Sequence, residues 1–590
     1  MSDHDLRQPG FAVLLLLAWG LAAVQLLVLN GGVDPGTMTD PDDVMRLVQM
    51  REFVSGRGWF DLHEPRLAPP GGYDSHWSRL IDAGLAGLFL VFRIAVTSAR
   101  AEFLMGIVWP LMWLLPAAAA VAAIAWRIGG REAAIVLLLL VAIGLPVMAQ
   151  FRPGRIDHHN VQITLALVAL AAAAWAERIR MAAACGAFTG LALAIGLEGL
   201  PFLVVAGAAV ALRFCVERAS APALRAYGLS LAVATLVGFL VTVGPAQWGR
   251  TACDMLAINW MEPVVAAGLG LVVAGGWFVS QHAAARCAAV AVALAVSATV
   301  FVAFEPRCLG GPYAMMAPGV REIWLAHVME MQPLWKFVSG KPAIAATIVT
   351  FPLVGLVAGI ALASEGAMRR NAGFLLAATA FVIAIAMTVA AVKVYNYAAW
   401  LAMPLVAGAV PRLFVRLRLT TLAARFLVAL LFTPAVLSVF TVKAVELAGA
   451  TPAYDDVRAC FETKNYAQFA RLPSGVIAGD INYGVMVLAL TRHAMLAAPY
   501  HRLSENILAT HEMFARPAEE ARRVIDAHGV DYLVSCGGSP PADMTAQESA
   551  NGLWASLASD DLPDWLEKLP REDGDAFTVY RIHRPGPVRP

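Results

Sequence analysis

Residues 101–149 read AEFLMGIVWPLMWLLPAAAAVAAIAWRIGGREAAIVLLLLVAIGLPVMA. Two long apolar runs, Ala101–Ala125 and Ala133–Ala149, flank the arginine-bearing segment Arg127–Arg131. A bilayer core about 30 Å thick needs roughly 20 apolar residues in a helix, because each residue advances the helix by about 1.5 Å. The stretch therefore predicts two membrane-spanning helices joined by a short, positively charged turn.

The same pattern fills the first three-quarters of the chain. Of its 590 residues, 59% are hydrophobic and only 15% are charged, and the mean hydropathy is +0.66. Soluble domains carry about 25% charged residues, so we predict an α-helical polytopic membrane protein with about thirteen transmembrane helices. Ile81–Ser98, which Arg93 interrupts, is predicted to be an interfacial amphipathic helix rather than a span. The remaining apolar runs are Phe11–Leu29, Val161–Trp175, Met181–Gly196, Pro201–Leu212, Tyr227–Gly244, Pro263–Val279, Cys287–Phe304, Pro342–Ala363, Phe374–Val392, Tyr397–Val410 and Phe426–Val445.

Arginines mark alternate loops between these runs. With the N-terminus inside, six arginine-bearing loops, among them Glu177–Arg180 and Met368–Asn371, fall on one side, which the positive-inside rule makes cytoplasmic. The first run has no small-residue cleavage site behind it, so we expect an anchor rather than a removed signal. Together with a composition rich in alanine and arginine, this predicts a multi-pass protein of a bacterial inner membrane with a cytoplasmic N-terminus and a periplasmic C-terminal domain.

The last part of the chain has a different composition. Strand-like runs alternate there with helical stretches such as Ala518–His528, which predicts a small α/β domain. We therefore expect a transmembrane domain at residues 1–446 and an extracytoplasmic domain at residues 447–590. Cys460 and Cys536 both lie in this second domain, and the sequence leaves a disulfide between them open. The strand-like runs are Gly475–Ala478, Asp531–Ser535 and Phe577–Ile582.

Ionisable residues are distributed unevenly between the apolar runs and the loops. The interiors of the runs are almost free of them, whereas acidic residues and histidines gather in the loops opposite the arginines. Transporters usually place polar residues at mid-bilayer in broken helices. The distribution therefore favours chemistry at the extracytoplasmic surface of the membrane over passage through it.

The first of these loops contains Asp40, Asp42 and Asp43, just before a helical stretch. Clustered carboxylates can bind a hard divalent cation through their oxygens. Alternatively, Asp42 or Asp43 caps the start of the helix, where a carboxylate accepts backbone hydrogen bonds and complements the helix dipole. Both interpretations stay open.

The segment FRPGRIDHHN, residues 151–160, follows the third apolar run. Asp157 and His159 are two residues apart, so in an extended segment both side chains would point to one side. A carboxylate and an imidazole can share a cation such as Mn²⁺. The alternative is a polar interfacial turn that binds lipid headgroups.

Two further loop positions carry charge near the membrane surface. Glu330 lies in VMEMQP, and Lys393 begins KVYNY at the outer end of an apolar run. The simpler interpretation of Glu330 is a solvated loop acid. The simpler interpretation of Lys393 is a lysine that anchors the end of a span. The KVYNY segment also places Lys393 and Tyr397 where the phosphate of a lipid would lie.

Taken in their order along the chain, these segments resemble the catalytic subunit of oligosaccharyltransferase, a glycosyltransferase of the membrane-embedded GT-C superfamily. Asp43, followed by a Gly-Trp-Phe turn at residues 58–60, looks like the aspartate of the family's first external loop, although Asp40 or Asp42 could take that role. Residues 157–159 (DHH) match the DxH form of the second acidic motif, and residues 330–333 (EMQP) are similar to the motif of the fifth external loop. The resemblance covers nearly the whole chain.

The acceptor motif departs from the family. After the last span the family carries WWDYG, and residues 479–484 read GDINYG here. The similarity implies an acceptor site at Asn482, Tyr483 and Gly484. Because the paired tryptophans that help those enzymes recognise an Asn-x-Ser/Thr acceptor are missing, we expect a glycolipid or polysaccharide acceptor ahead of protein asparagine.

The resemblance implies a metal-dependent glycosyltransferase that moves a sugar from a polyprenyl-phosphate or -diphosphate donor to an acceptor at the extracytoplasmic face. Asp43 and Glu330 would act as catalytic residues, and a divalent cation, Mn²⁺ or Mg²⁺, would have four ligands. These ligands would be Asp43, Asp157, His159 and Glu330. The donor phosphate would be bound by Lys393, Arg155 and Tyr397.

Three other functions stay open at this point. The first is transfer to protein asparagine, and the second is a transporter or flippase of lipid-linked sugars. The third is a non-catalytic scaffold, which would apply if the loop residues do not converge. The net charge of +1 argues against a nucleic-acid partner, because no basic surplus is available to neutralise phosphates.

Overall fold

The computed structural model describes residues 9–30, 40–449, 456–537, 541 and 544–584. The chain forms two compact units, each made of three segments of the sequence. The first unit lies within Met1–Gly32, Trp77–Ala314 and Pro333–Pro452, and the second lies within Val33–His76, Met315–Gln332 and Ala453–Pro590. Two loop segments thus belong to the same unit as the C-terminal residues, and the boundary expected between residues 446 and 447 stays a prediction.

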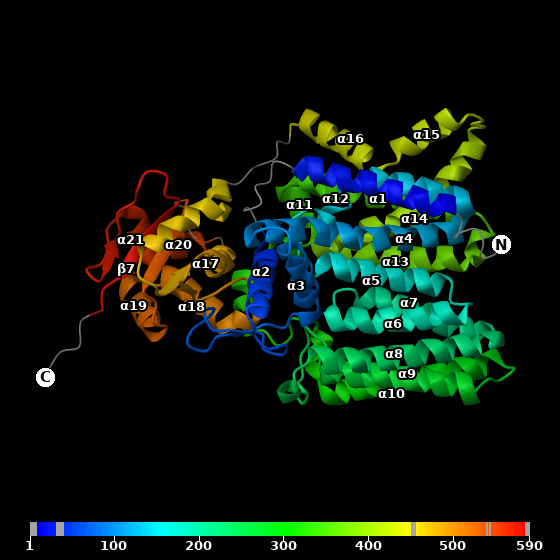
Figure 1. The fold of residues 1–590 in the computed structure, drawn as a ribbon, viewed down its shortest axis with the longest axis horizontal. Coiled ribbons are helices and arrows are strands. Elements are labelled where there is room, and N and C mark those ends of the chain that lie inside the picture. The colour runs from blue at the N-terminus through cyan, green and yellow to red at the C-terminus, as the bar shows by residue number, and fades with distance from the viewer. Residues whose placement is uncertain (1–8, 31–39, 450–455, 538–540, 542–543, 585–590) are drawn as a thin grey trace. The chain divides into compact units, whose positions relative to one another are not determined.

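The first unit is a bundle of α-helices, as Figure 1 shows. In the described residues, eight helices are long and apolar enough to cross a bilayer, or nine if α15 and α16, bent by 51° at their junction, count as one span. The helices are α1 (Pro9–Asn30), α3 (Arg79–Arg93), α4 (Ser98–Ala142), α5 (His159–Ala174), α6 (Ile179–Ile195), α7 (Leu200–Val216), α8 (Ala221–Thr242), α9 (Ile258–Trp277), α10 (Ala283–Phe304), α11 (Leu334–Gly340), α12 (Pro342–Ala363), α13 (Ala372–Ala390), α14 (Tyr395–Arg416), α15 (Leu422–Leu431) and α16 (Pro434–Leu447).

The 45 residues of α4 contain both apolar runs of the 101–149 stretch. The backbone leaves the helical conformation at Gly129 and at Gly130, where φ is +70°, a value that glycine adopts without steric penalty. Two helices therefore meet at the turn that the sequence predicts. Each of the other apolar runs also coincides with helix, so the polytopic helical fold is confirmed, while the number thirteen stays a prediction.

The final apolar run differs from its prediction. Phe426–Val445 was expected to be one continuous helix, but α15 ends at Leu431 and α16 begins at Pro434. The backbone is extended at Thr433, and Pro434 then begins α16 at its first position, where a missing N–H removes no intrahelical hydrogen bond. The run is a bent pair.

The helices of the bundle approach one another closely through glycine. A Cβ on Gly228 of α8 would lie 2.4 Å from the carbonyl oxygen of Gly268 on α9, and a Cβ on Gly190 of α6 would lie 2.7 Å from the Cβ of Ala234 on α8. Small residues at such crossings let backbones pack tightly where no hydrophobic force draws helices together in lipid. Larger side chains at these positions would force the helices apart.

Helix α3 matches the predicted amphipathic helix. One of its faces is buried through Ile81, Leu85 and Phe89, whereas Leu90 and Val91 on the other face are 54% and 61% exposed. The exposed face is thus apolar too, which suits a helix at the lipid interface. Its interfacial location stays a prediction.

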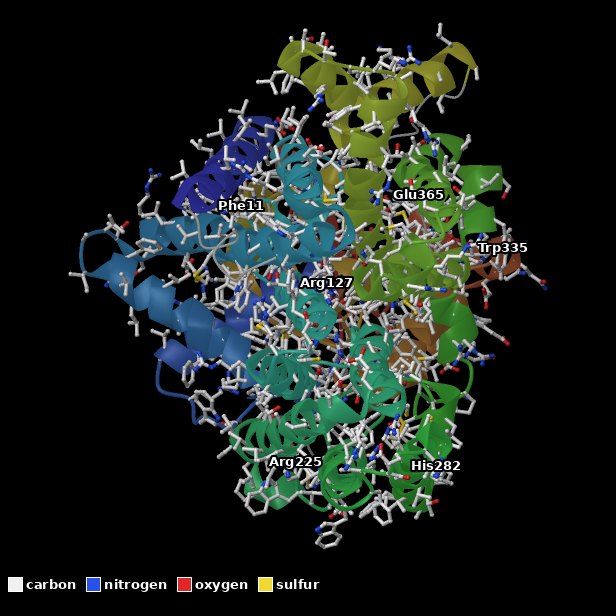
Figure 2. The ribbon with its side chains drawn as sticks, turned by 90° about the vertical axis from the view of Figure 1, so that its right-hand side faces the viewer. Phe11, Arg127, Arg225, His282, Trp335 and Glu365 are labelled. Atoms are coloured by element: carbon white, nitrogen blue, oxygen red, sulfur yellow. A yellow bond between two sulfur atoms is a disulfide. The ribbon has the colours of Figure 1, made fainter. Side chains whose placement is uncertain are left out.

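Several loops predicted to be cytoplasmic lie at the same end of the bundle. Figure 2 looks along the helices onto this end, where Arg127, Arg225, His282 and Glu365 are labelled. Three of these residues come from the arginine-bearing segments of the sequence, and Glu365 follows α12 directly. The side of the membrane that these loops face stays a prediction.

The second unit contains a five-stranded sheet in the order β4-β3-β5-β7-β6. Strand β3 pairs in parallel with β4 and β5, and β7 pairs antiparallel with β5 and β6. The predicted α/β fold of this region is confirmed. Its strands are β3 (Val476–Gly479), β4 (Ala494–Met495), β5 (Tyr532–Cys536), β6 (Leu566–Lys568) and β7 (Phe577–Ile582). Its helices are α2 (Pro41–Val54), α17 (Gly484–Leu490), α18 (Ser504–Ala515), α19 (Ala518–Ala527), α20 (Ala546–Asn551) and α21 (Leu553–Ser559), and a hairpin joins β1 (His63–Glu64) to β2 (Tyr73–Asp74).

The loop after the first span is built into this second unit. Leu67 lies beside Met495 as a parallel bridge, and the N–H of Ala68 donates to the Met495 carbonyl at 2.8 Å. The Arg51 guanidinium on α2 donates to the Ala489 carbonyl at the end of α17 at 3.1 Å. Backbone hydrogen bonds thus connect residues that are more than 400 positions apart in the sequence.

Four of the seven cysteines form disulfides. Cys460 is bonded to Cys536, which settles the pairing that the sequence left open, and Cys253 is bonded to Cys308 within the first unit. The unpaired cysteines are Cys185, Cys215 and Cys287. All four bonded cysteines belong to loops or tail segments that were predicted to be extracytoplasmic.

Candidate functional site

The Asp157–His159 segment forms a tight polar turn at the start of α5. His159 is the first residue of the helix, and its Nε2 lies 3.1 Å from Asp157 Oδ2. His158 contacts the other carboxylate oxygen of Asp157 through Nδ1, and its ring packs against His159 and Trp77. The two side chains expected to lie together do so, but through a different conformation. His158 is helical (φ −76°, ψ −14°) rather than extended, so the turn and not strand alternation brings them together.

Asn160 holds this turn in place. Its Nδ2 donates to the carbonyls of Arg155 and Gln150 at 2.9 and 3.3 Å, and its own carbonyl accepts from the Thr164 hydroxyl. Asn160 is only 1% exposed. The loop before α5 is therefore fixed by the first turn of the helix, which presents Asp157 in one orientation.

A second carboxylate completes the cluster. Glu198 lies in the short loop between α6 and α7, and its Oε2 lies 2.8 Å from His159 Nδ1. Its other oxygen, Oε1, lies 2.7 Å from the ammonium of Lys393, at the start of α14. The resulting chain Asp157–His159–Glu198–Lys393 connects three segments of the first unit through three short contacts. We call these four residues the α5 cluster.

The α5 cluster is buried at Asp157 and His159 and half-buried at Glu198 and Lys393, whose side chains are 29% and 22% exposed. Asp157 and His159 are 1% and 7% exposed. Burial alone would raise the pKa of Glu198, but the charges of His159 and Lys393 outweigh it and hold the pKa well below its ordinary value of 4.5. Glu198 is therefore a carboxylate, and its charge favours a fixed orientation of the His159 ring.

Sequence reasoning missed Glu198. The residue stands alone in GLEG, without a neighbouring acid or histidine to mark it. The signal that could have found it is topological: an acid in a short loop that opens on the same side as residues 157–159 and Lys393. Only the contacts between side chains from different helices show which of several loop acids belongs to the cluster.

Two other residues predicted to bind a donor phosphate lie in the first unit. The Tyr397 hydroxyl is buried next to the Glu198 loop, since a Cβ on Gly199 would lie 3.6 Å from it, and its ring stacks on Phe202. Arg155 is partly buried and donates through Nε to Gln150 Oε1 at 3.1 Å. The phosphate-binding roles of Arg155, Tyr397 and Lys393 stay predictions.

Several buried polar atoms near the start of α14 have no hydrogen-bond partner. In the described part of the chain, they include Tyr395 Oη, Asn396 Oδ1, Tyr397 Oη and Trp400 Nε1. A buried polar atom without a partner costs about 1–3 kcal/mol, so native structures usually provide a ligand or a water. The beginning of α14 thus has unused hydrogen-bonding capacity beside the α5 cluster.

In the second unit, Asp40 and not Asp42 or Asp43 caps helix α2. The Asp40 carboxylate accepts from the N–H of Asp42 at 3.0 Å, and its backbone is extended as an N-cap requires. The cap assignment made from the sequence was therefore shifted by two or three residues. Asp43 lies inside the first turn and is 3% exposed, so capping does not account for it.

Glu330 also belongs to the second unit. It lies in a single 3-10 turn, Met329–Met331, and is exposed. Asp43 and Glu330 are thus in one unit, and Asp157 and His159 are in the other. A cation site shared by all four residues stays a prediction.

The three predicted acceptor residues follow strand β3. The Tyr483 hydroxyl donates to the Val534 carbonyl and accepts from the Asp480 N–H, both at 3.0 Å, and the side chain is 4% exposed. Gly484 begins α17, where a Cβ would lie 2.4 Å from the Ala497 carbonyl oxygen. Only Asn482 is exposed, and its amide donates to Asp480 Oδ1 at 2.9 Å. Packing within the second unit accounts for a tyrosine at position 483 and a glycine at position 484. The acceptor roles of all three residues stay predictions.

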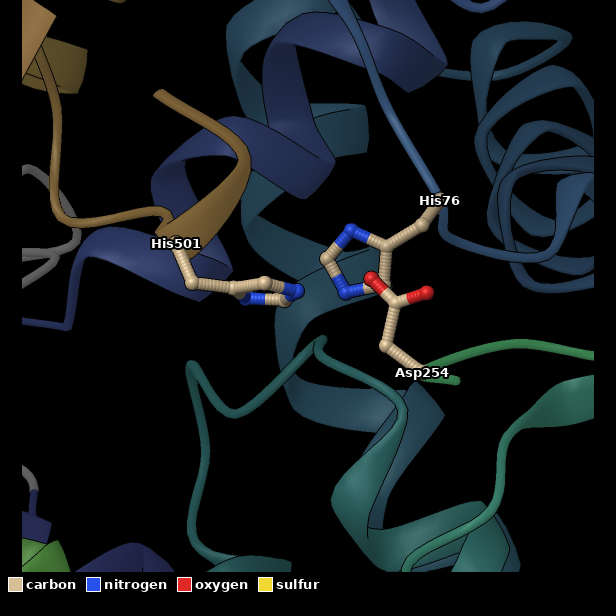
Figure 3. Close-up of side chains that lie close together, drawn as sticks. All are labelled: His76, Asp254 and His501. Atoms are coloured by element: carbon tan, nitrogen blue, oxygen red, sulfur yellow. The ribbon is translucent and has the colours of Figure 1, made fainter. Parts of the chain in front are cut away.

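Two histidines of the second unit also lie together. The rings of His76 and His501 are 5.1 Å apart between centroids and meet edge to face, as Figure 3 shows. His501 follows Tyr500, whose ring stacks on Tyr73 at 5.3 Å. Asp254, labelled in the same figure, belongs to the first unit. The histidine pair was not predicted from the sequence.

The turn before α5, which shares Asp157 and His159 with the α5 cluster, has a donor set suited to a metal ion. Asp157, His158 and His159 each offer a ligand atom, and these atoms all lie within 4.8 Å of one another. Imidazole with carboxylate suits Mn²⁺ and other transition metals, whereas Mg²⁺ prefers oxygen ligands and water. A second carboxylate, Glu198, holds the other nitrogen of His159, which is the usual outer partner of a metal-binding histidine. The residues therefore fit a divalent cation.

Comparison with solved structures identifies the fold. The apo crystal structure of the Archaeoglobus fulgidus oligosaccharyltransferase matches 90% of this chain and 70% of its own, with 13% identity and a TM-score of 0.68. The chain has the fold of an oligosaccharyltransferase. The same archaeal protein, AglB, matches with the same coverage and identity and a TM-score of 0.67 in complex with an inhibitory peptide and a dolichol-phosphate. Its complex with Zn and sulfate gives a TM-score of 0.58 at 14% identity over 89% of this chain and 68% of its own.

The sequence itself gives no such match. No protein-family model matches the chain, and no curated protein matches its sequence. The oligosaccharyltransferase-like fold predicted from the order of the loop motifs is nevertheless confirmed by structure. The two proteins share a fold although their sequences are only 13% identical.

Proposed function

We propose that the chain is a metal-dependent glycosyltransferase that moves a sugar from a polyprenyl-phosphate or -diphosphate donor to an acceptor at the extracytoplasmic face of the membrane. The observation that carries the proposal is the α5 cluster, whose carboxylates, imidazole and ammonium lie at a helix end of a membrane bundle, with Asp157 and His159 buried. Such a location suits a donor whose tail stays in lipid while its phosphate reaches the loops. The oligosaccharyltransferase fold agrees with this assignment.

Asp157 and His159 would hold the divalent cation, Mn²⁺ or Mg²⁺, together with Asp43 and Glu330 of the second unit. Bound there, the cation would offset the negative charge that develops on the departing phosphate. Glu198 would fix the ring of His159, so its role is positioning rather than direct contact. The Zn and sulfate in the archaeal complex belong to that protein and support a divalent cation here only in general terms.

The remaining roles concern the donor and the acceptor. Lys393, Arg155 and Tyr397 would bind the donor phosphate, and the partnerless atoms at the start of α14 supply further hydrogen bonds. Lys393 can serve both Glu198 and a phosphate because an ammonium carries three donor hydrogens. Asp43 would accept the proton of the acceptor as general base.

We infer the orientation of the chain from its disulfides together with its arginines. Both disulfides involve residues on the side opposite the arginine-bearing loops, where an oxidising compartment lets disulfides persist. The unpaired Cys215 and Cys287 flank loops on the arginine side. These observations support the proposal that the C-terminal domain lies in the periplasm of a bacterial inner membrane, with the N-terminus in the cytoplasm.

A glycolipid or polysaccharide is the preferred acceptor. The segment Gly479–Gly484 lacks the paired tryptophans of WWDYG, and its tyrosine is committed to the core of the second unit. Transfer to protein asparagine is the alternative, since the archaeal enzyme has been captured with an acceptor peptide containing the NVT sequon. A flippase of lipid-linked sugars is the alternative of another class. The location of the α5 cluster at helix ends, not at mid-span, favours an enzyme.

The test is a donor-turnover assay on the purified full chain in lipid nanodiscs, with a radiolabelled polyprenyl-phosphate sugar and Mn²⁺. Membrane glycolipids and an Asn-x-Ser/Thr peptide would be supplied in parallel as acceptors. We expect sugar transfer to the glycolipid fraction that stops on adding EDTA and in Asp157→Ala. Turnover that is equal with EDTA and in Asp157→Ala would overturn the proposal, and transfer only to the peptide would select the alternative acceptor.

A further inference from the structure

A groove between α12 and α14 lies at the opposite end of these helices from Lys393. It encloses about 380 Å³ and is lined by apolar side chains from both helices and by Phe432, from the bend between α15 and α16. The lining of the groove includes Leu353, Val357, Val406, Val410 and Leu413. Leu353 and Val357 are 52% and 67% exposed, so the groove is open on a face of the bundle that is apolar.

The length of the groove corresponds to one leaflet of a bilayer. On α12 its lining runs from Leu353 to Leu362, and on α14 it runs from Val406 to Arg416. The two paths cover nine and ten residue steps, which is about 14–15 Å at about 1.5 Å per residue. Half of a hydrocarbon core about 30 Å thick is also about 15 Å.

Charged residues line only one end of the groove. Arg412 is committed to structure, because its Nε lies 2.8 Å from Glu365 Oε2 and its Nη1 donates to the Gly408 carbonyl. Arg416, the last residue of α14, is exposed and has no acidic partner among the residues that the structure describes. Since Arg412 and Glu365 offset each other, the end of the groove carries one net positive charge, on Arg416.

We propose that this groove binds an anionic phospholipid, with an acyl chain along α12 and α14 and the phosphate of its headgroup at Arg416. The apolar lining and its length of about one leaflet match an acyl chain. The net positive charge at the end of the groove matches the phosphate of the headgroup. Basic residues beside grooves between membrane helices attract anionic headgroups, each with about 1 kcal/mol near the surface. The proposal does not depend on the glycosyltransferase assignment, because the groove shares no residue with the α5 cluster.

The bend between α15 and α16 has a role in this proposal. The Thr350 and Thr441 hydroxyls lie 2.9 Å apart and tie α16 to α12, while the break at Phe432 and Thr433 turns α15 away. The side chain of Phe432 then lines the groove. If residues 422–447 formed one continuous helix, α15 would not turn away from α16 at Phe432.

The test is native mass spectrometry of the delipidated full chain titrated with phosphatidylglycerol or phosphatidylcholine. We expect saturable binding of one phosphatidylglycerol with a preference of about fivefold over phosphatidylcholine, the ratio that about 1 kcal/mol provides. Arg416→Gln should remove the preference, whereas Arg418→Gln, an exposed arginine outside the groove, should keep it. Ala361→Phe should weaken both lipids by filling the lining, with thermal unfolding of each variant as the control for folding.

Four outcomes would overturn the proposal. They are equal binding of the two lipids, equal losses in Arg416→Gln and Arg418→Gln, stronger binding of polyprenyl phosphate than of phosphatidylglycerol, and displacement of the lipid by millimolar inorganic phosphate. The last result would assign Arg416 to a free anion rather than to a headgroup. Absence of any lipid adduct on folded protein would overturn the proposal as well.

Discussion

The α5 cluster and the segment Asn482–Gly484 were both singled out by the same family resemblance, yet their surroundings differ. In the segment, the Tyr483 hydroxyl is both donor and acceptor in backbone hydrogen bonds, and Gly484 is required by close packing. In the α5 cluster, two carboxylates, an imidazole and an ammonium are gathered at the end of an apolar bundle. Hydrogen bonding and packing within the second unit account for Tyr483 and Gly484. They do not account for the charged residues of the α5 cluster.

This difference shows how burial can separate structural from functional polar residues. A hydroxyl whose hydrogen bonds close within its own domain contributes to stability and needs no other role. A buried network of ions is weak evidence for stability, because desolvation offsets most of the attraction between its charges. Its retention in a membrane bundle therefore points to binding or catalysis.

The largest effect is expected when the carboxylate of Asp157 is removed. Asp157→Ala should lower the rate of sugar transfer by roughly 10²–10³-fold, the loss that follows removal of one key electrostatic group from an active site. Glu132→Gln, an exposed acid whose partner is Arg425, is the matched control and should keep full activity. Equal rates in wild type and Asp157→Ala would show that the α5 cluster is not needed for transfer, so function would no longer distinguish it from the segment Asn482–Gly484.

A second variant tests the positioning role of Glu198. Glu198→Gln should weaken Mn²⁺ binding by roughly 10–100-fold, as loss of an outer carboxylate typically does. The effect should appear in isothermal titration without any substrate, and Glu198→Asp should restore part of the affinity. If Glu198→Gln binds Mn²⁺ like the wild type, Glu198 is only the partner of Lys393.

Tyr483→Phe tests the structural side of the comparison. The change leaves the Val534 carbonyl and the Asp480 N–H without their partner, so it should lower the free energy of unfolding by about 1–3 kcal/mol. Transfer activity well below the unfolding temperature should change little. Asn482→Ala, which alters an exposed side chain, should leave the Tm unchanged. An intact Tm with lost transfer in Tyr483→Phe would move this residue into the acceptor site.

The smallest effect is expected at Glu52, a half-buried acid on α2 whose carboxylate lies 3.0 Å from the Arg57 guanidinium. Burial and the neighbouring Glu64 raise the pKa of Glu52 on α2 to about 8. The folded state thus favours neutral Glu52, and the stability that it contributes should be lost as the pH rises from about 4.5 through 8. Thermal unfolding from pH 6 to 9 should show a falling Tm in the wild type and a flatter profile in Glu52→Gln. Identical Tm profiles in the two proteins would show that Glu52 is not the source of the pH dependence of stability.

Much of the fold could be predicted because membrane helices leave strong sequence signals. Apolar runs located the helices, and the arginine-bearing segment Arg127–Arg131 located the break inside α4. The bend between α15 and α16 was missed because Pro434 lies within an otherwise uniform apolar run. Hydropathy measures composition and is insensitive to an extended backbone at a single residue.

The candidate site could be predicted only where its residues are close in sequence. Asp157 and His159 were found as a local pair, although the turn that joins them was not. Glu198 was missed because its relation to His159 exists only across helices. Asp40 was passed over as the cap of α2 because three nearby aspartates compete for that role, and backbone geometry alone decides among them.

The most direct test of the central claim is a Mn²⁺ titration of the purified full chain, comparing wild type with Asp157→Ala and with Glu132→Gln. We predict one saturable site in wild type and Glu132→Gln, and loss of that site in Asp157→Ala while the protein stays folded. Equal binding by all three proteins would contradict this prediction, because the α5 cluster would then hold its charges for a reason other than a metal ion.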